Sequence, residues 1–160
     1  TFEEPTRSVL LPDPFEEPFY QPNLTIVLEL NDLLVKPEWN YSSGLRFKKR
    51  PGVDLLIKEL GYPNSELIIF TTDNFNSNEI IHALDSQGKF IYRLFKDSTR
   101  LENGEYIKDI KLMNRDPSKI VFIDCNAESC KYQNENSLIL KPWDGNMDDT
   151  QIFDLAAFLK

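Results

Sequence analysis

The sequence has few of the residues on which many metal-binding and catalytic sites depend. It contains two cysteines and one histidine, too few for a disulfide framework or a cysteine–histidine zinc site. We therefore interpret Cys125 and Cys130 as free thiols, and His82 as a surface residue of a helix. No run of 18 apolar residues occurs, so we expect no membrane-spanning helix in this chain. The chain opens with neither a signal-like nor a transit-like segment, which is typical of a domain excised from a longer protein.

Basic residues are also scarce, at 18 Lys and Arg against 26 Asp and Glu, and the net charge is −8. This charge argues against nucleic acid as a partner and favours basic partners, although solubility alone would also account for it. A chain of 160 residues with 41% apolar and 28% charged residues is typical of one soluble globular domain.

Proline marks off the first part of the chain. Five prolines fall within residues 1–23, which predicts an extended arm rather than a helix. This arm is predicted to lie against the domain through its apolar residues, which are Leu10, Leu11, Phe15, Phe19 and Tyr20.

Residues 24–160 alternate short apolar runs with helical patterns, which predicts a doubly wound, mostly parallel α/β domain. Buried strands are expected over 26–30, 66–72, 90–95, 120–125 and 138–140, and helices over 51–60, 76–84 and from 148 or 149 onwards. Aromatic and apolar residues around a Ser42–Gly44 turn predict a protruding β-hairpin. Its returning strand ends in a basic run, Arg46, Lys48, Lys49 and Arg50, which we interpret as a solvated face or a contact surface.

Polar residues follow the first buried strand, at the end where open α/β sheets place their sites. The segment Thr25–Val35 resembles motif I of the haloacid-dehalogenase-like phosphatases, in the branch of the small C-terminal-domain phosphatases. That motif carries a nucleophilic Asp, a second Asp that protonates the leaving group, and a Thr or Val. Here the three positions hold Glu29, Asn31 and Leu33.

These replacements predict that the chemistry is lost. Glu29 is one methylene longer than Asp, and a displacement of about 1 Å costs on the order of 100-fold in rate. Asn31 cannot exchange a proton near neutral pH, so general acid–base catalysis, about 10²–10⁴-fold, is lost as well. We therefore expect no enzyme activity, no metal and no cofactor.

Other parts of the phosphatase pattern remain. Thr71 matches the phosphate-binding hydroxyl of motif II, and Lys108 matches the phosphate-binding lysine of motif III. Asp124 matches the Mg²⁺-binding Asp of motif IV, but Cys125 follows it where the family has Asn or Asp. We expect a buried polar cluster in which Lys108 pairs with Asp124 or Glu29. Residual anion binding and slow hydrolysis are the alternatives.

Several longer stretches narrow the resemblance, and they are found in residues 10–13, 18–22, 37–39, 44–52, 93–96, 112–116 and 141–145. Together they resemble the receptor subunits of the presequence translocase of the mitochondrial inner membrane. The resemblance implies a non-catalytic receptor that faces the intermembrane space and is membrane-anchored in its full length. Such a receptor binds presequences, which are Arg-rich amphipathic helices, and passes them to the channel subunit.

The resemblance also implies contact residues. Arg46 and Lys49 would contact the channel subunit, and Asp109, Ile110 and Met113 would line an adjoining presequence groove. The competing hypotheses are a protein phosphatase of the small C-terminal-domain type, and a pseudophosphatase that binds phosphopeptides through Thr71 and Lys108.

Overall fold

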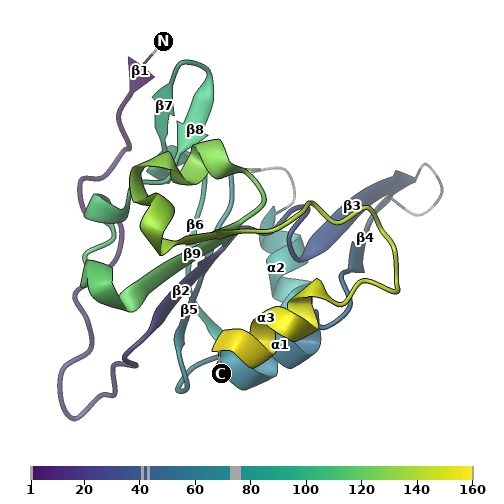
Figure 1. The fold of residues 1–160 in the computed structure, drawn as a ribbon, viewed down its shortest axis with the longest axis horizontal. Coiled ribbons are helices and arrows are strands. Elements are labelled where there is room, and N and C mark those ends of the chain that lie inside the picture. The colour runs from purple at the N-terminus through teal and green to yellow at the C-terminus, as the bar shows by residue number, and fades with distance from the viewer. Residues whose placement is uncertain (1, 41, 43, 73–76, 160) are drawn as a thin grey trace.

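A five-stranded parallel sheet forms the centre of the computed structural model, which describes residues 2–40, 42, 44–72 and 77–159. The strand order is β10-β9-β2-β5-β6, and every pairing in it is parallel. The five strands are β2 (Thr25–Leu28), β5 (Glu66–Phe70), β6 (Phe90–Leu94), β9 (Ile120–Asp124) and β10 (Ser137–Ile139), as Figure 1 shows. The predicted fold class is confirmed.

The two central strands are buried along their whole length. Every residue of β2 and β5 is buried, because their side chains point alternately to two covered faces of the sheet. The outer strands β6 and β10 keep partly exposed residues. This difference explains why the central strands read as continuous apolar runs.

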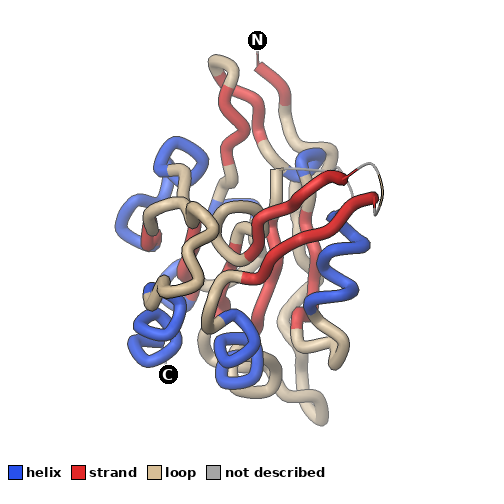
Figure 2. Tube along the Cα trace, turned by 90° about the vertical axis from the view of Figure 1, so that its right-hand side faces the viewer, coloured by secondary structure: helices blue, strands red, loops and turns tan. Residues whose placement is uncertain are grey.

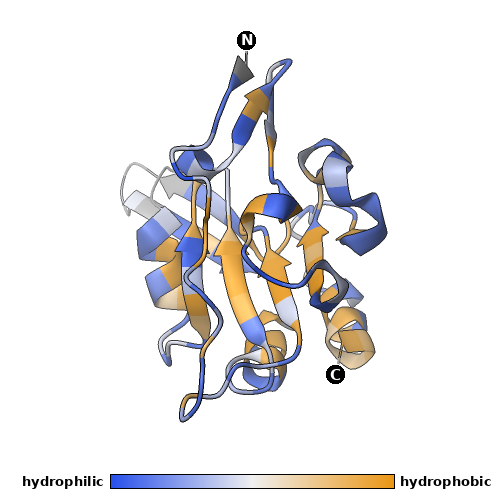
Figure 3. Ribbon diagram, turned by 90° about the vertical axis from the view of Figure 1, so that its left-hand side faces the viewer, coloured by the Kyte–Doolittle hydropathy of each residue, from blue (hydrophilic) through white to orange (hydrophobic). Residues whose placement is uncertain are grey.

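The two faces of the sheet are covered differently. The helices α1 (Val53–Leu60), α2 (Ser77–Leu84) and α3 (Gln151–Leu159) share one core with the β2 residues Ile26 and Leu28. The opposite face packs Val27 and Ile68 against the arm and the segments around η2 (Ile110–Leu112) and η4 (Ala127–Asn136). On that face the connections are 3-10 turns rather than α-helices. In Figure 3 the apolar strands stand out between these more polar covering segments.

The first helix begins later than predicted. Helix α1 starts at Val53, and Gly52 precedes it with φ 95°. A Cβ atom at Gly52 would lie 3.0 Å from the backbone nitrogen of Phe153, so α3 packs against the chain exactly where the backbone takes this left-handed turn. Pro51 therefore lies in a turn and not at the first helical position. The end at Gly61 was predicted correctly.

Two smaller sheets project from the central one. The strands β3 (Val35–Asn40) and β4 (Gly44–Lys49) form the predicted hairpin, which extends away from the body in Figure 1 and lies across the front of it in Figure 2. Part of its predicted turn, Ser43, lies outside the described residues. The second sheet has the order β1-β7-β8, with β1 (Phe2–Glu3), β7 (Arg100–Glu102) and β8 (Glu105–Ile107). A tight turn at Asn103 and Gly104 joins β7 to β8, and both residues have positive φ.

The arm is buried through residues 10–11, and its segment 15–20 lies on the surface. Leu10 and Leu11 are buried in the second core, and the Leu10 amide donates to the Leu112 carbonyl over 2.8 Å. Phe15, Phe19 and Tyr20 are 36%, 70% and 55% exposed, and the rings of Phe15 and Tyr20 lie beside the Tyr62 ring of the domain. Their one described aromatic neighbour outside the arm is Tyr62. The arm also contributes the strand β1, which the proline pattern did not predict.

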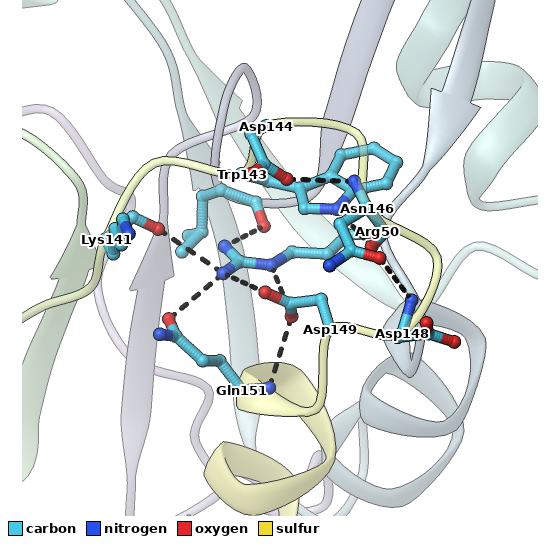
Figure 4. A network of polar contacts seen from close by, with 9 residues as sticks. Arg50, Lys141, Trp143, Asp144, Asn146, Asp148, Asp149 and Gln151 are labelled. Carbon is cyan, nitrogen blue, oxygen red and sulfur yellow. Dashed lines mark hydrogen bonds and ion pairs between the residues drawn. The ribbon is translucent and has the colours of Figure 1, made fainter.

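Arg50 connects the base of the β3–β4 hairpin to the C-terminal helix. Its guanidinium is buried and donates to both carboxylate oxygens of Asp149, at 2.9 and 3.0 Å, and to Gln151 at 3.0 Å. It also donates to the backbone carbonyls of Leu33 and Lys141. Figure 4 shows the segment 141–151 wrapped around this side chain. Arg50 is therefore part of the interior and not of the basic surface predicted for the hairpin.

Candidate functional site

The carboxyl ends of the central strands bring three of the predicted site residues to one edge. Glu29 follows β2, Thr71 follows β5 and Asp124 ends β9, and β2 pairs with both other strands. The Glu29 amide continues the ladder by donating to the Ile123 carbonyl over 3.1 Å. Parallel pairing thus gathers side chains that lie up to 95 positions apart in the sequence.

Lys108 lies between the two carboxylates. Its Nζ donates to Glu29 Oε2 over 2.8 Å and to Asp124 Oδ2 over 2.6 Å, and all three residues are buried. The other carboxylate oxygens accept from backbone amides, Glu29 Oε1 from Leu30, and Asp124 Oδ1 from Cys125 and Asn126. The predicted buried cluster is confirmed, with Lys108 bound to both carboxylates rather than to one.

The charges of this cluster stabilise one another. Burial alone lowers the pKa of Lys108, but the charges of Glu29 and Asp124 outweigh it and hold the pKa above its usual value. The ammonium is therefore permanently charged near neutral pH. One cation and two carboxylates leave an excess of negative charge, which repels a phosphoryl group.

The cluster opens into a pocket of about 270 Å³. Its lining consists of Glu29, Asn31, Asp32, Thr72, Asp124, Cys125, Asn126, Ser129 and Pro142. Leu33 is fully buried in the core and takes no part in it. Thr71 is also fully buried, and the lining includes Thr72 instead.

Cys125 reaches the pocket as an unreactive thiol. Burial, and then the Asp124 carboxylate, raise the pKa of Cys125 to about 12, so almost no thiolate exists at neutral pH. Burial and Asp124 likewise raise the pKa of Cys130 to about 12. Both cysteines are free thiols, as predicted.

The residues at this edge do not suit a magnesium ion. The carboxylate oxygens that face the cluster are already bound by the Lys108 ammonium, and their other oxygens accept backbone amides. Across the described residues, no group of three or more His, Cys, Asp and Glu side chains is arranged to hold a metal. No step through a metal ion follows from this geometry.

The basic surface of the β3–β4 hairpin is smaller than the sequence predicted. Arg46 is exposed, whereas the Lys49 ammonium forms an ion pair with Asp54 at 2.9 Å. Lys48 lies 3.4 Å from Glu38 on the opposite strand. With Arg50 buried, Arg46 carries most of the charge that a partner would meet.

Two of the three predicted groove residues, Asp109 and Ile110, line a second pocket, of about 370 Å³. It is lined by Arg100, Glu102, Asp109, Ile110, Lys111 and Tyr132. Asp109 is buried, forms an ion pair with Arg100 at 3.0 Å and accepts the Lys111 amide. Sequence reasoning missed Arg100 and Tyr132, because they come from segments with no motif.

Met113 does not line this pocket. It is fully buried against the sheet, because the 3-10 turn η2 points it into the second core. A direct partner contact through Met113 is therefore contradicted by its burial. The β7–β8 hairpin, which leads to Asp109, and the β3–β4 hairpin lie apart in Figures 1 and 2. Arg46 is on β4 and Asp109 follows β8, so the two predicted contact surfaces come from different elements.

Comparison with known proteins identifies the family. The family model described as NLI interacting factor-like phosphatase matches residues 24–160. The chain belongs to this family. Its fold is similar to that of the fission yeast RNA polymerase II CTD phosphatase Fcp1, with a TM-score of 0.56, 17% identity, and coverage of 76% of this chain and 42% of that one. A second Fcp1 structure gives a TM-score of 0.58 at 16% identity, over 86% of this chain and 50% of that one.

Curated relatives confirm the closer resemblance. The chain is 48% identical to the mitochondrial import inner membrane translocase subunit TIM50 of Homo sapiens over 158 residues, which is 98% of this chain and 44% of the relative. It is 49% identical to TIM50 of Danio rerio, over 98% of this chain and 41% of the relative. TIM50 of Caenorhabditis elegans is 44% identical, over 98% of this chain and 35% of the relative. The chain therefore spans less than half the length of these relatives.

Proposed function

We propose that this chain is the phosphatase-like part of a non-catalytic receptor for mitochondrial presequences. The receptor belongs to the inner-membrane translocase, faces the intermembrane space and passes presequences to the channel subunit. Support comes from identities near 48% to translocase subunits over almost the whole chain. In the part of the chain that the structure describes, no helix is both long and apolar enough to cross a bilayer.

The observation that carries the non-catalytic proposal is the pairing of Lys108 with Glu29 and Asp124 at 2.8 and 2.6 Å. A phosphatase must present a free nucleophile and a cationic phosphate site. Here the carboxylate at the nucleophile position and the cation neutralise each other. The same pairing argues against the phosphopeptide-binding alternative, because Lys108 has no charge to spare for a second anion.

The receptor proposal draws on charge and shape. Presequences are basic amphipathic helices, and a net charge of −8 favours their approach. The pocket beside Asp109 and Ile110 combines a carboxylate with an apolar side chain and an aromatic ring, Tyr132. This combination suits a helix that presents one apolar and one basic face.

Titration with a fluorescent presequence peptide and with a matched phosphopeptide tests the function. We expect saturable binding of the presequence that weakens as salt rises, and no saturable binding of the phosphopeptide. A preference for the phosphopeptide would reject the receptor proposal in favour of a pseudophosphatase.

The catalytic alternative has its own assay. Hydrolysis of an aryl phosphate with Mg²⁺ should stay at background for the wild-type chain and for Glu29→Ala alike. Activity that is present in the wild type and lost in Glu29→Ala would show that the site still turns over.

A further inference from the structure

The tip of the arm exposes aromatic side chains that the core does not use. Phe15, Phe19 and Tyr20 lie within six positions of one another and are 36%, 70% and 55% exposed. The other exposed large apolar residues include Met147 and two rings of helix α3, Phe153 and Phe158. A local group of exposed rings on a soluble domain marks a contact surface.

The tip of the arm, residues 15–21, is a loop with defined hydrogen bonds. The Phe19 amide donates to the Glu16 carbonyl over 2.9 Å, and the Phe15 amide donates to Gln21 Oε1 over 3.0 Å. Tyr62 lies beneath the rings, with its centroid 6.1 Å from that of Phe15 and 6.4 Å from that of Tyr20. Its hydroxyl donates to the Tyr20 carbonyl over 2.8 Å. The loop is therefore closed by its own hydrogen bonds and fixed to the loop after α1.

Carboxylates accompany the rings. Glu16 and Glu17 are exposed, and no ion pair of either is found among the described side chains. Of the nearby cations, Arg115 is paired with the buried Glu66 carboxylate at 2.7 Å, whereas Lys89 keeps its charge while it donates to the Tyr62 carbonyl at 3.4 Å, and Lys119 lines a pocket with Pro14 and Gln21. The carboxylates of Glu16 and Glu17 therefore remain available to a cationic partner, although cations lie on both sides of the loop.

We propose that this surface, formed by Phe15, Glu16, Glu17, Phe19, Tyr20 and Tyr62 and here called the arm-tip patch, docks a basic amphipathic peptide segment. Lys and Arg side chains of the partner pair with the carboxylates and lie over the aromatic faces, while its apolar side chains cover Phe19 and Tyr20. Aromatic rings beside charge are the composition of binding hot spots.

The same charges disfavour the other occupants. Glu16 and Glu17 repel the phosphates of nucleic acid and of an anionic bilayer. A second copy of the chain would place four carboxylates against one another. Of these occupants, a basic peptide is the one that the carboxylates of Glu16 and Glu17 would attract.

The arm-tip patch is distinct from the sites at the carboxyl edge of the sheet. Tyr62 lies in the loop that enters β5, and the arm itself leads into β2, so the patch lies at the amino ends of these strands. The pocket lined by Glu29 and Asp124 lies at the carboxyl ends of β2 and β9. The pocket lined by Asp109 lies beside the β7–β8 hairpin. The inference therefore adds a second surface for basic amphipathic helices, which are the ligand class of the proposed function, and in that respect it rests on the proposed function.

Binding of an Arg-rich amphipathic helical peptide, followed by fluorescence anisotropy, tests the proposal. The double variant Phe19→Ser/Tyr20→Ser should bind about tenfold more weakly. The double variant Glu16→Gln/Glu17→Gln should bind about threefold more weakly at low salt. Phe158→Ser, at a ring that is 74% exposed on α3, and Glu128→Gln, at an exposed carboxylate, are the matched controls and should leave the affinity unchanged.

Amide NMR shifts locate the contact. The peptide should shift the amides of residues 13–21 and 62, and these shifts should vanish in Phe19→Ser/Tyr20→Ser while the folded spectrum is retained. Shifts confined to residues 100–113 would overturn the arm-tip patch and leave the proposed receptor function standing. Unchanged affinity in both double variants would overturn it as well.

Two further measurements address the other occupants. Co-sedimentation with phosphatidylcholine vesicles, with and without phosphatidylserine, that is lost in Phe19→Ser/Tyr20→Ser would assign the rings to a membrane and overturn the proposal. Concentration-dependent dimerisation lost in the same variant would assign them to a second copy, with the same consequence. We expect the protein to be a monomer that does not co-sediment with either kind of vesicle and that binds the peptide through the arm-tip patch.

Discussion

A single lysine accounts for the way the polar side chains at the carboxyl edge of the sheet are held together. Lys108 is buried between Glu29 and Asp124, and Gln133 Nε2 donates to its carbonyl over 2.6 Å. Removing the lysine would leave two carboxylates in the interior without their cation. The residues therefore have a structural reason to persist together without catalysis, and the substitutions at Asn31, Leu33 and Cys125 fall on positions outside this triad.

The first prediction concerns Lys108→Met. The variant leaves two buried carboxylates without their cation, so the free energy of unfolding should fall by about 3–5 kcal/mol at pH 7. Urea unfolding measures this change. Lys131→Met is the control, because Lys131 is a partly exposed lysine 3.5 Å from Glu102 and should cost less than about 1 kcal/mol.

The pH dependence of the same variant has a defined sign. The folded pKa of Lys108 lies above its ordinary value of 10.5, so its contribution is complete below pH 10.5 and is lost as pH rises through the folded pKa. Lys108→Met should therefore lack this alkaline loss. Equal stability of wild type and Lys108→Met at pH 7 would contradict the pairing.

At the scale of elements, the arm behaves as part of the core. Leu10 and Leu11 fill the sheet face that no α-helix covers, and Asn114 and Arg115 bind the carbonyls of Leu11 and Pro12. A face of a parallel sheet must be covered, and here an extended segment takes the place of a helix.

The second prediction tests this packing with neighbouring residues. Leu10→Ala should lower the free energy of unfolding by about 2–5 kcal/mol, because it leaves a cavity against the sheet. Val9→Ala, at a side chain that is 53% exposed, should change it by less than about 0.5 kcal/mol. Deletion of Thr1–Pro18 should lower the melting temperature further. Comparable values for Leu10→Ala and Val9→Ala would show that the arm is not docked.

The third prediction concerns the connection between the β3–β4 hairpin and α3. Hydrogen bonding by Arg50 lowers the pKa of Asp149 below its ordinary value of 3.8. The stabilisation is therefore complete above pH 3.8 and is lost as pH falls through the lowered folded pKa. Asp149→Asn should cost about 1–3 kcal/mol at pH 7, and this difference should shrink below pH 3.8.

Denaturant unfolding at pH 7 and at pH 3 measures both parts of this prediction. Asp148→Asn, at an exposed neighbour, should show neither effect. If Asp149→Asn lowered the free energy of unfolding by the same amount at both pH values, the stabilisation would not depend on the charge of Asp149, and the prediction would be wrong.

The limits of sequence-based prediction follow from particular elements. Apolar runs located all five strands, because burial on both faces leaves an unbroken pattern at β2 and β5. Arg50 was assigned to the surface because its neighbours are charged, and its partner Asp149 is 99 positions away. Met113 was assigned to a groove by resemblance, although a single 3-10 turn directs it into the core. A pattern of residues along the chain does not specify which distant segments come into contact, nor the direction in which a short turn points its side chains.

Across the whole molecule, charge is divided by location. The carboxyl edge holds the Lys108 cluster with two carboxylates to one cation, the β3–β4 hairpin presents Arg46 on an otherwise acidic protein, and the arm tip presents Glu16 and Glu17. A basic peptide and an acidic partner would be attracted to different places on this surface. The proposed receptor role requires such a division, because the incoming cargo and the next subunit would have to be bound without excluding each other.

The last prediction separates these two roles. The double variant Arg46→Glu/Lys49→Glu reverses the basic end of the β3–β4 hairpin, where a cationic presequence would be repelled and an acidic or polar segment of the channel subunit would be attracted. It should weaken the channel-subunit interaction by about tenfold and leave presequence affinity largely unchanged. Asp109→Asn should weaken presequence binding instead, by a smaller factor, because Arg100 at 3.0 Å already shares the carboxylate. Binding of both ligands to each variant, measured at low salt and again at a salt concentration that screens surface charge, gives the comparison. Loss of presequence binding in the hairpin variant with the channel subunit still bound would mean that the two surfaces are assigned the wrong way round.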